Sequence, residues 1–233
     1  MEKKSLLFLQ CGTQEHGVSH LEQRFESYGL AVDHYWAYQN QFPESLSQYS
    51  GIFISGSPHG AYEDIPFINH LHTFLADAAS QDIPMLGVCF GSQILASALC
   101  GRDQVFIRTP CEVAYKALPT TAACKQDLIA KDLTSSVSMF VWHNDEVKAG
   151  HPDMVILADS DVCANHIWRF RDQKIWGIQG HPEISREQAL QWFEINRERL
   201  TTDGADIEAL KRDAHDAPEA KTLLKNFADV CLA

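Results

Sequence analysis

The sequence of 233 residues lacks the features that mark several large classes of protein. It contains no run of 18 apolar residues, as a membrane-spanning helix requires, and the apolar stretch 6–9 is too short for the core of a secretory signal. Its seven cysteines are scattered, odd in number and never spaced as C-x-x-C, so the sequence predicts neither a zinc site nor a thiol redox centre. From these absences we expect a cytoplasmic protein with reduced cysteines and with no metal or other cofactor.

Basic residues are also scarce. Nineteen Lys and Arg against thirty-one Asp and Glu leave a formal net charge of −12, which opposes binding to nucleic acid or to an anionic membrane surface. The hydrophobic content of 45% is that of an ordinary globular protein. Without repeats or low-complexity linkers, the sequence predicts one domain over residues 1–233, with a core at about 5–185 and C-terminal helices at about 185–231.

Short apolar segments alternate with turn signals and helical patterns through roughly the first hundred residues. This alternation is typical of βα units, which build a mostly parallel sheet flanked by helices, and we expect a flavodoxin-like α/β fold. The predicted strands are 5–11, 30–38, 51–56 and 84–88, and a helix is predicted over 92–100.

The middle of the chain is richer in strands, which favours a smaller mixed or antiparallel extension of the sheet. Two sites have the spacing of a capping box at a helix start, Ser19 with Glu22 and Ser185 with Gln188. The strands predicted in this region are 104–107, 138–142, 154–158, 163–170 and 174–179.

Cys89 lies between a predicted strand and a predicted helix, within Gly87-Val-Cys-Phe-Gly91. A G-x-nucleophile-x-G sequence in this context forms a sharp turn, the nucleophile elbow, which exposes its central side chain. The two glycines let strand and helix pack closely, and the helix N-terminus favours the thiolate, which is the reactive form of cysteine. The alternative interpretation is an ordinary small buried cysteine.

A thiolate nucleophile needs a base, and usually a third group that orients the base. Among eleven histidines, His181 follows an apolar strand and precedes Pro182 and Glu183. Residues i and i+2 of an extended segment face the same side, so Glu183 can hold the imidazole of His181 in one tautomer. Taken alone, His-Pro-Glu also fits a strand end that leads into a capped helix.

Acyl chemistry also needs an oxyanion hole made of backbone N–H groups near the nucleophile. The sequence offers two sources of such groups. One is the amide of Phe90, directly after Cys89, and the other is the loop 55–60 after the third strand, especially Ser57. Taken alone, this loop is also an ordinary βα turn.

These residues together resemble the class I, or triad-type, glutamine amidotransferases, particularly the amidotransferase domain of GMP synthases and their free-standing relatives. Residues 87–93, Gly-Val-Cys-Phe-Gly-Ser-Gln, resemble the family's G-V-C-[FY]-G-x-Q elbow. Residues 177–183 are similar to its G-x-Q-x-H-P-E, and residues 54–58 resemble its S-G-G-P oxyanion strand. The resemblance covers about residues 5–185 and implies a triad of Cys89, His181 and Glu183, with an oxyanion hole formed by the amides of Ser57 and Phe90.

The resemblance also implies which residues contact the substrate. Trp142-His-Asn-Asp145 resembles the family's S-H-G-D segment beside the substrate, although taken alone it fits a strand-end turn. The substrate contacts implied in this way are Gly56, Gln93, His143, Asn144 and Asp145.

Three features depart from the family's pattern. Ser57 replaces the second glycine of the oxyanion loop, and Gly180 stands before His181, where amidotransferase domains commonly have Phe and free-standing γ-glutamyl peptidases have Gly. The sequence also lacks the Ser-Gly-Gly-Val-Asp-Ser-type loop of the ATP-pyrophosphatase domain of a complete GMP synthase. We therefore expect hydrolysis of the γ-amide of glutamine or of another γ-glutamyl compound through a glutamyl thioester on Cys89, without GMP synthesis by this chain alone.

Three interpretations remain open. The chain could be a glutaminase that works as one component of a larger enzyme and passes ammonia to a separate synthetase, or it could be a free-standing γ-glutamyl peptide hydrolase. The third is a catalytically silent binding or regulatory homologue. The expected partners are a small γ-glutamyl substrate and, in the first case, the synthetase; a homo-oligomer is also compatible with the sequence.

Overall fold

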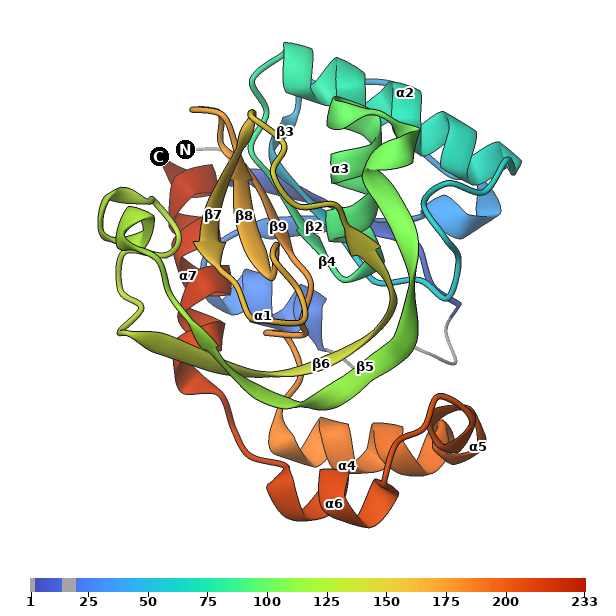
Figure 1. The fold of residues 1–233 in the computed structure, drawn as a ribbon. Coiled ribbons are helices and arrows are strands. Elements are labelled where there is room, and N and C mark those ends of the chain that lie inside the picture. Colours follow the sequence, from blue (N-terminus) through green and yellow to red (C-terminus); the bar gives the residue numbers. More distant parts are fainter. Residues whose placement is uncertain (1–2, 14–19) are drawn as a thin grey trace.

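A seven-stranded sheet forms the centre of the fold. The computed structural model describes residues 3–13 and 20–233 and orders the strands β2-β1-β3-β4-β9-β8-β7 (Figure 1). The first five are parallel to one another, whereas β8 pairs antiparallel with both β9 and β7. The strands are β1 (Ser5–Gln10), β2 (Ala31–Trp36), β3 (Tyr49–Ile54), β4 (Met85–Val88), β7 (Met154–Ala158), β8 (Ile167–Phe170) and β9 (Ile175–Ile178).

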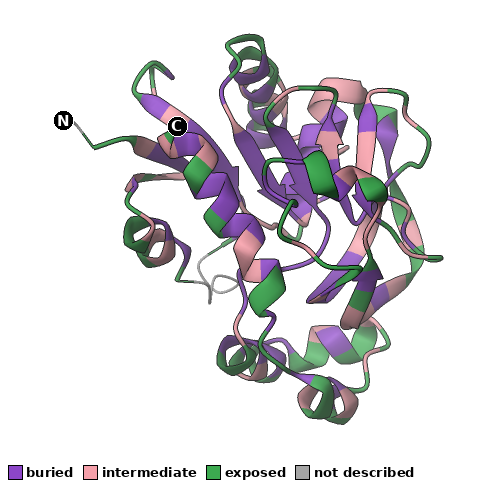
Figure 2. Cartoon of the chain, turned by 90° about the vertical axis from the view of Figure 1, so that its left-hand side faces the viewer, coloured by how far each residue is buried: buried purple, intermediate pink, exposed green. Residues whose placement is uncertain are grey.

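Helices cover both faces of this sheet because its inner strands are apolar on both sides. In β1, for example, Leu6 and Phe8 pack into one core cluster, and Leu7 and Leu9 pack into the other. Figure 2 shows the central strands buried between the helices. The sequence's prediction of a mostly parallel sheet flanked by helices is therefore confirmed. The first layer contains α1 (Leu21–Ser27) and α7 (Pro218–Leu232), and the second contains α2 (Pro66–Ser80) and α3 (Phe90–Cys100).

A second sheet of two long antiparallel strands, β5 (Val105–Pro119) and β6 (Ser136–Val147), crosses beside the first. Three short helices pack against β6 through a third cluster of buried side chains that includes Phe140, Trp142 and Trp192. This arrangement confirms the predicted antiparallel extension. The helices are α4 (Arg186–Ile195), α5 (Arg197–Thr202) and α6 (Ile207–Asp213).

Several boundaries differ from those predicted. β5 continues to Pro119 instead of ending at residue 107, because its pairing with β6 resumes at Glu112 after an irregular stretch at 108–111. The capping box at Ser185 and Gln188 is confirmed, with both hydrogen bonds present, whereas Ser19 lies outside the described residues. None of the helices in the described ranges is long and apolar enough to cross a membrane. Short 3₁₀ segments occur at Ala37–Gln39, Arg102–Gln104 and Ala122–Gln126.

The C-terminal helix α7 is more deeply buried than its charged sequence suggests. Seven of its residues are buried, and Phe227 is fully buried against Phe25 and Trp176 of the first core cluster. The helix therefore closes one face of the sheet.

We predict that Phe227→Ala lowers the free energy of unfolding by about 3–5 kcal/mol, because the substitution removes an aromatic ring from a closed core and leaves a cavity. Urea denaturation measures this difference. Lys225→Ala, which removes an exposed side chain from the same helix, is the control and should change stability by no more than about 0.5 kcal/mol. Equal effects of the two substitutions would contradict this account of α7.

Candidate active site

Cys89 occupies a strained turn between β4 and α3. Its backbone has φ 52° and ψ −112°, in the left-handed half of conformational space that non-glycine residues seldom adopt. A Cβ atom on Gly91 would collide with the carbonyl oxygen of Ile54, and one on Gly87 would collide with the carbonyl oxygen of Gly91. The predicted elbow is thus present, and only glycine fits at the positions two residues before and after Cys89.

His181 lies three residues after the end of β9, the strand next to β4. Its backbone N–H donates to the carbonyl oxygen of Phe140 on β6 at 2.9 Å. Its Nδ1 donates to Oε1 of Glu183 at 2.8 Å, and both side chains are buried. Because Nδ1 is engaged in this way, Nε2 is the nitrogen left for another partner, and within the described residues it has no hydrogen bond.

The charge state of His181 follows from its neighbours. Burial opposes a positive charge on the ring, but the Glu183 carboxylate and the nearby Cys89 side chain outweigh it and raise the pKa of His181 to about 10. The raised pKa places the proton on His181, between the Glu183 carboxylate and the side chain of Cys89.

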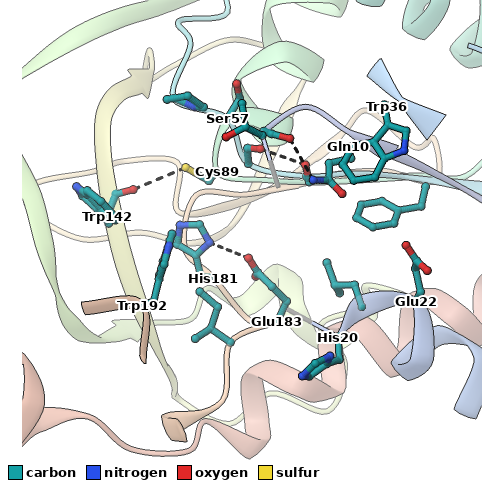
Figure 3. A pocket seen from close by; sticks show the side chains of 18 of the residues that line it. Gln10, His20, Glu22, Trp36, Ser57, Cys89, Trp142, His181, Glu183 and Trp192 are labelled. Carbon is teal, nitrogen blue, oxygen red and sulfur yellow. Dashed lines mark hydrogen bonds and ion pairs between the residues drawn. The ribbon is translucent and has the colours of Figure 1, made fainter. Parts of the chain in front are cut away.

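The loop after β3 approaches the side chains of Cys89 and His181. A Cβ atom on Gly56 would lie 3.6 Å from Cβ of Cys89 and 3.7 Å from Cε1 of His181. Ser57 follows Gly56 and lines the same cavity as Cys89. Phe90, the residue directly after Cys89, begins α3. Ser55 fixes the loop, because its Oγ accepts from the amide of Cys11 at 2.9 Å. Figure 3 shows Ser57, Cys89, His181 and Glu183 around one cavity.

Of the five expected substrate contacts, Gly56 lines the same cavity as His181 and Glu183, and the other four lie on the other side of Cys89. Gln93 donates from Nε2 to the carbonyl oxygen of Asp145 at 2.9 Å, which ties α3 to β6. Asn144 and Asp145 line a smaller cavity together with Cys89 and Gln93. His143 contributes to the same cavity, but its side chain is fully buried: Nδ1 bonds to the Asp145 carbonyl oxygen and Nε2 lies 2.8 Å from Oε2 of Glu112. Both ring nitrogens are therefore engaged within the chain.

Glu112 was not singled out from the sequence. Burial opposes its ionisation, but hydrogen bonds from His143 and Lys116 outweigh it and hold the pKa of Glu112 at about 2. Its carboxylate anchors His143 across the β5–β6 pair, and so holds the segment 142–145 in place. No local motif marks such a cross-strand partner.

Gly180 explains how β6 reaches the site. A Cβ atom there would lie 2.5 Å from Sδ of Met139 and 3.1 Å from the carbonyl oxygen of Phe140. β6 occupies the space that a side chain at position 180 would need. The same strand brings the Trp142 carbonyl oxygen to 3.7 Å from Sγ of Cys89. Gly180 thus permits a close approach of two segments.

The larger cavity has a volume of about 290 Å³. Besides Cys89, His181 and Glu183, it is lined by side chains that the sequence did not single out, because they come from helices and strands without a motif of their own. Among the described residues, no group of three or more His, Cys, Asp or Glu side chains is arranged to hold a metal ion. The additional lining side chains include Gln10, Trp36, Trp192 and Arg199, whereas Trp142, which also lines the cavity, belongs to the segment 142–145 that the sequence did indicate.

Comparison with known proteins identifies the family. The sequence model described as class-I glutamine amidotransferase matches residues 15–194, and the chain therefore belongs to this family. A glutamine-hydrolyzing GMP synthase of Porphyromonas gingivalis is 28% identical over 175 residues, which are 75% of this chain and 31% of that protein. The chain thus spans about a third of the length of that relative.

Relatives of similar length also exist. One subunit of the glutamine-hydrolyzing GMP synthase of Halobacterium salinarum is 29% identical over 176 residues, 74% of this chain and 87% of the relative. The crystal structure of a glutamine amidotransferase from Thermotoga maritima superposes with a TM-score of 0.82 at 21% identity, covering 100% of this chain and 97% of that one. A glutamine amidotransferase from Methylobacillus flagellatus gives a TM-score of 0.81 at 22% identity, covering 99% and 94%. These two structures share the fold.

We predict that Cys89 is the cysteine that iodoacetamide modifies first at neutral pH. Burial raises the pKa of each of the other six thiols, to about 11 for Cys100 and about 12 for Cys111, so these thiols hold little thiolate. Time-resolved peptide mapping by mass spectrometry measures the order. Cys111 is the internal control, since it is also partly accessible; its modification before Cys89 would argue against an activated site.

Proposed function

We propose that this protein hydrolyses the γ-amide bond of glutamine or of another γ-glutamyl compound, with Cys89 as nucleophile, His181 as acid and base, and Glu183 as the group that orients His181. The observation that carries this proposal is the buried 2.8 Å hydrogen bond between His181 and Glu183 on the cavity that also contains the Cys89 elbow. The family's name is consistent with it.

In the first half of the reaction, the thiolate of Cys89 attacks the γ-carbonyl carbon and forms a tetrahedral oxyanion. The backbone N–H groups of Ser57 and Phe90 stabilise this oxyanion, with the positive end of α3 behind the second of them. The C–N bond then breaks, His181 donates its Nε2 proton to the leaving nitrogen, and the amine departs from a glutamyl thioester.

In the second half, His181 accepts a proton from water as the water oxygen attacks the thioester carbon. The C–S bond breaks, glutamate leaves, and Cys89 returns to the thiolate paired with the imidazolium. Glu183 stabilises the cation on His181, which is why its position beside that ring matters.

Two versions of this function are each supported by an observation. The relative from Halobacterium salinarum is a subunit of a GMP synthase, which favours a glutaminase that passes ammonia to a separate synthetase. The cavity of about 290 Å³ beside His181 is much larger than ammonia needs, which favours γ-glutamyl compounds with larger leaving groups.

We predict that the purified chain releases glutamate from at least one of glutamine, glutathione and a panel of γ-glutamyl amino acids, and that Cys89→Ser abolishes the release. A serine hydroxyl beside the same base is a far weaker nucleophile than a thiolate. Free glutamate and ammonia are followed together, and circular dichroism serves to check the fold of the variant. Near-normal turnover by a folded Cys89→Ser protein would sink the mechanism, and wild-type silence on every substrate would favour a catalytically silent homologue.

We predict that Glu183→Gln lowers kcat by about 10- to 10³-fold with little change in substrate binding. Loss of the carboxylate removes the strongest influence that raises the pKa of His181, so the alkaline limb of the kcat/KM profile, where His181 of the free enzyme loses its proton, should move to lower pH. A pH series of kcat/KM for both proteins measures this shift. An unchanged rate and an unmoved limb would mean that another group holds His181.

A further inference from the structure

We propose that Arg199 binds a carboxylate on the leaving group, so that the preferred substrates are γ-glutamyl amino acids or peptides whose leaving amine carries a carboxylate close to its nitrogen. This inference rests on the proposed function and specifies its substrate class. It follows from the position of one cation, from the groups around it, and from the side of Cys89 on which the leaving group must lie.

Arg199 belongs to α5, yet it lines both cavities that meet at Cys89. Of the described residues that line either cavity, it is the only Arg or Lys. The carboxylates of the larger cavity are already paired within the chain: Glu183 bonds to His181, and Glu22 forms an ion pair with His34. The guanidinium of Arg199 is therefore the group best suited to attract an anionic part of a substrate.

The side chain of Arg199 is held by a cation–π contact and by a long ion pair with Asp203, without a direct hydrogen bond to that carboxylate. Its Cζ lies 4.8 Å from the centre of the Trp142 ring, a cation–π contact. The indole N–H of Trp142 donates to Oδ2 of Asp203 at 2.9 Å, while Nε of Arg199 lies 3.9 Å from the same oxygen, beyond hydrogen-bond distance. The Arg199 side chain is 40% exposed, so its planar set of donors can reach a ligand in the cavity.

The direction of proton transfer indicates which part of the substrate lies here. His181 must donate to the leaving nitrogen, so the leaving group lies on the side of Cys89 where His181 is found. His181 and Glu183 line the larger cavity, whereas Gln93 and Asn144 line the smaller one. We therefore assign the glutamyl half of the substrate to the smaller cavity and the leaving group to the larger one.

Two tryptophans complete the wall beside Arg199. Trp192 of α4 packs edge-on against His181, with ring centres 5.2 Å apart, and against Trp142 at the same separation. A leaving group that extends past His181 meets this aromatic wall and then the guanidinium. A carboxylate is the planar anion that an arginine binds with two parallel hydrogen bonds, which a neutral amide cannot match.

The test compares three substrates that differ at one group: γ-glutamylglycine, γ-glutamylglycinamide, and glutamine, which has no leaving-group carboxylate. For the wild type we expect kcat/KM for γ-glutamylglycine to exceed that for the glycinamide by about tenfold. Arg199→Gln should remove most of this preference, lowering kcat/KM for γ-glutamylglycine by about tenfold while leaving the other two substrates within about twofold. Arg199→Lys, which keeps the charge without the planar fork, should fall between the two.

Arg197→Gln is the matched control, since Arg197 lies on the same short helix, is similarly exposed and pairs with Glu194. It should leave all three rates unchanged.

An equal loss on all three substrates for Arg199→Gln would mean that Arg199 serves the glutamyl half or the fold. No loss on any substrate would mean that Arg199 does not bind substrate. Either result overturns this inference and leaves the proposed function standing. Hydrolysis of glutamine with no hydrolysis of either glycine derivative would do the same. A wild type that hydrolyses none of the three would overturn both this inference and the proposed function.

Discussion

The backbone conformation of Cys89 is the constraint on which the site depends. A non-glycine residue at φ 52° is strained by an amount on the order of 1–3 kcal/mol, and such a turn persists only where its surroundings determine it. Here the amide of Cys89 is fixed by the carbonyl oxygen of Ile178 at 2.8 Å, and Gly87 and Gly91 permit contacts that a Cβ atom would block. The same strand pairing that fixes the elbow brings the segment after β9, and with it His181, next to the sulfur.

The second sheet and the helices behind it complete the active site that lies at the edge of the central sheet. β6 supplies the Phe140 carbonyl oxygen that fixes the backbone of His181 and the Trp142 carbonyl oxygen beside the sulfur of Cys89. The helices α4 and α5 then add Trp192 and Arg199 at the far wall. The central sheet thus holds the reacting groups, while the surrounding elements form the cavity walls that determine which substrates can reach them.

Those parts of the site that lie within a short stretch of the chain could be predicted from the sequence. The elbow and the His-Pro-Glu segment are short strings, and the hydrogen bond between His181 and Glu183 joins the two side chains that the sequence paired. The backbone there differs from the extended segment that was predicted, because residues 182 and 183 form a turn in which the Ile184 N–H donates to the His181 carbonyl oxygen at 3.4 Å. The parallel sheet could be predicted for a similar reason, because its buried strands read as apolar runs.

The rest depends on contacts between distant segments. Glu112 meets His143 only because β5 resumes its pairing with β6 after an irregular stretch at 108–111, and Pro110 within that stretch interrupts the pattern by which a continuous strand is recognised from sequence. Arg199 reaches the cavity because α5 packs behind β6, and no periodicity in residues 197–202 indicates that packing. Such residues are found only after the fold is known.

The account's central claim is that the sulfur of Cys89 attacks the carbonyl carbon of the γ-amide, and an affinity label tests it most directly. A diazoketone analogue of glutamine carries an electrophilic carbon next to the position of the scissile amide, so it alkylates the group that attacks there. After incubation and peptide mapping by mass spectrometry, the account predicts a single adduct on Cys89 whose formation is slowed by excess glutamine or γ-glutamyl peptide. An adduct on a different residue, or labelling of Cys89 that neither substrate slows, would contradict it.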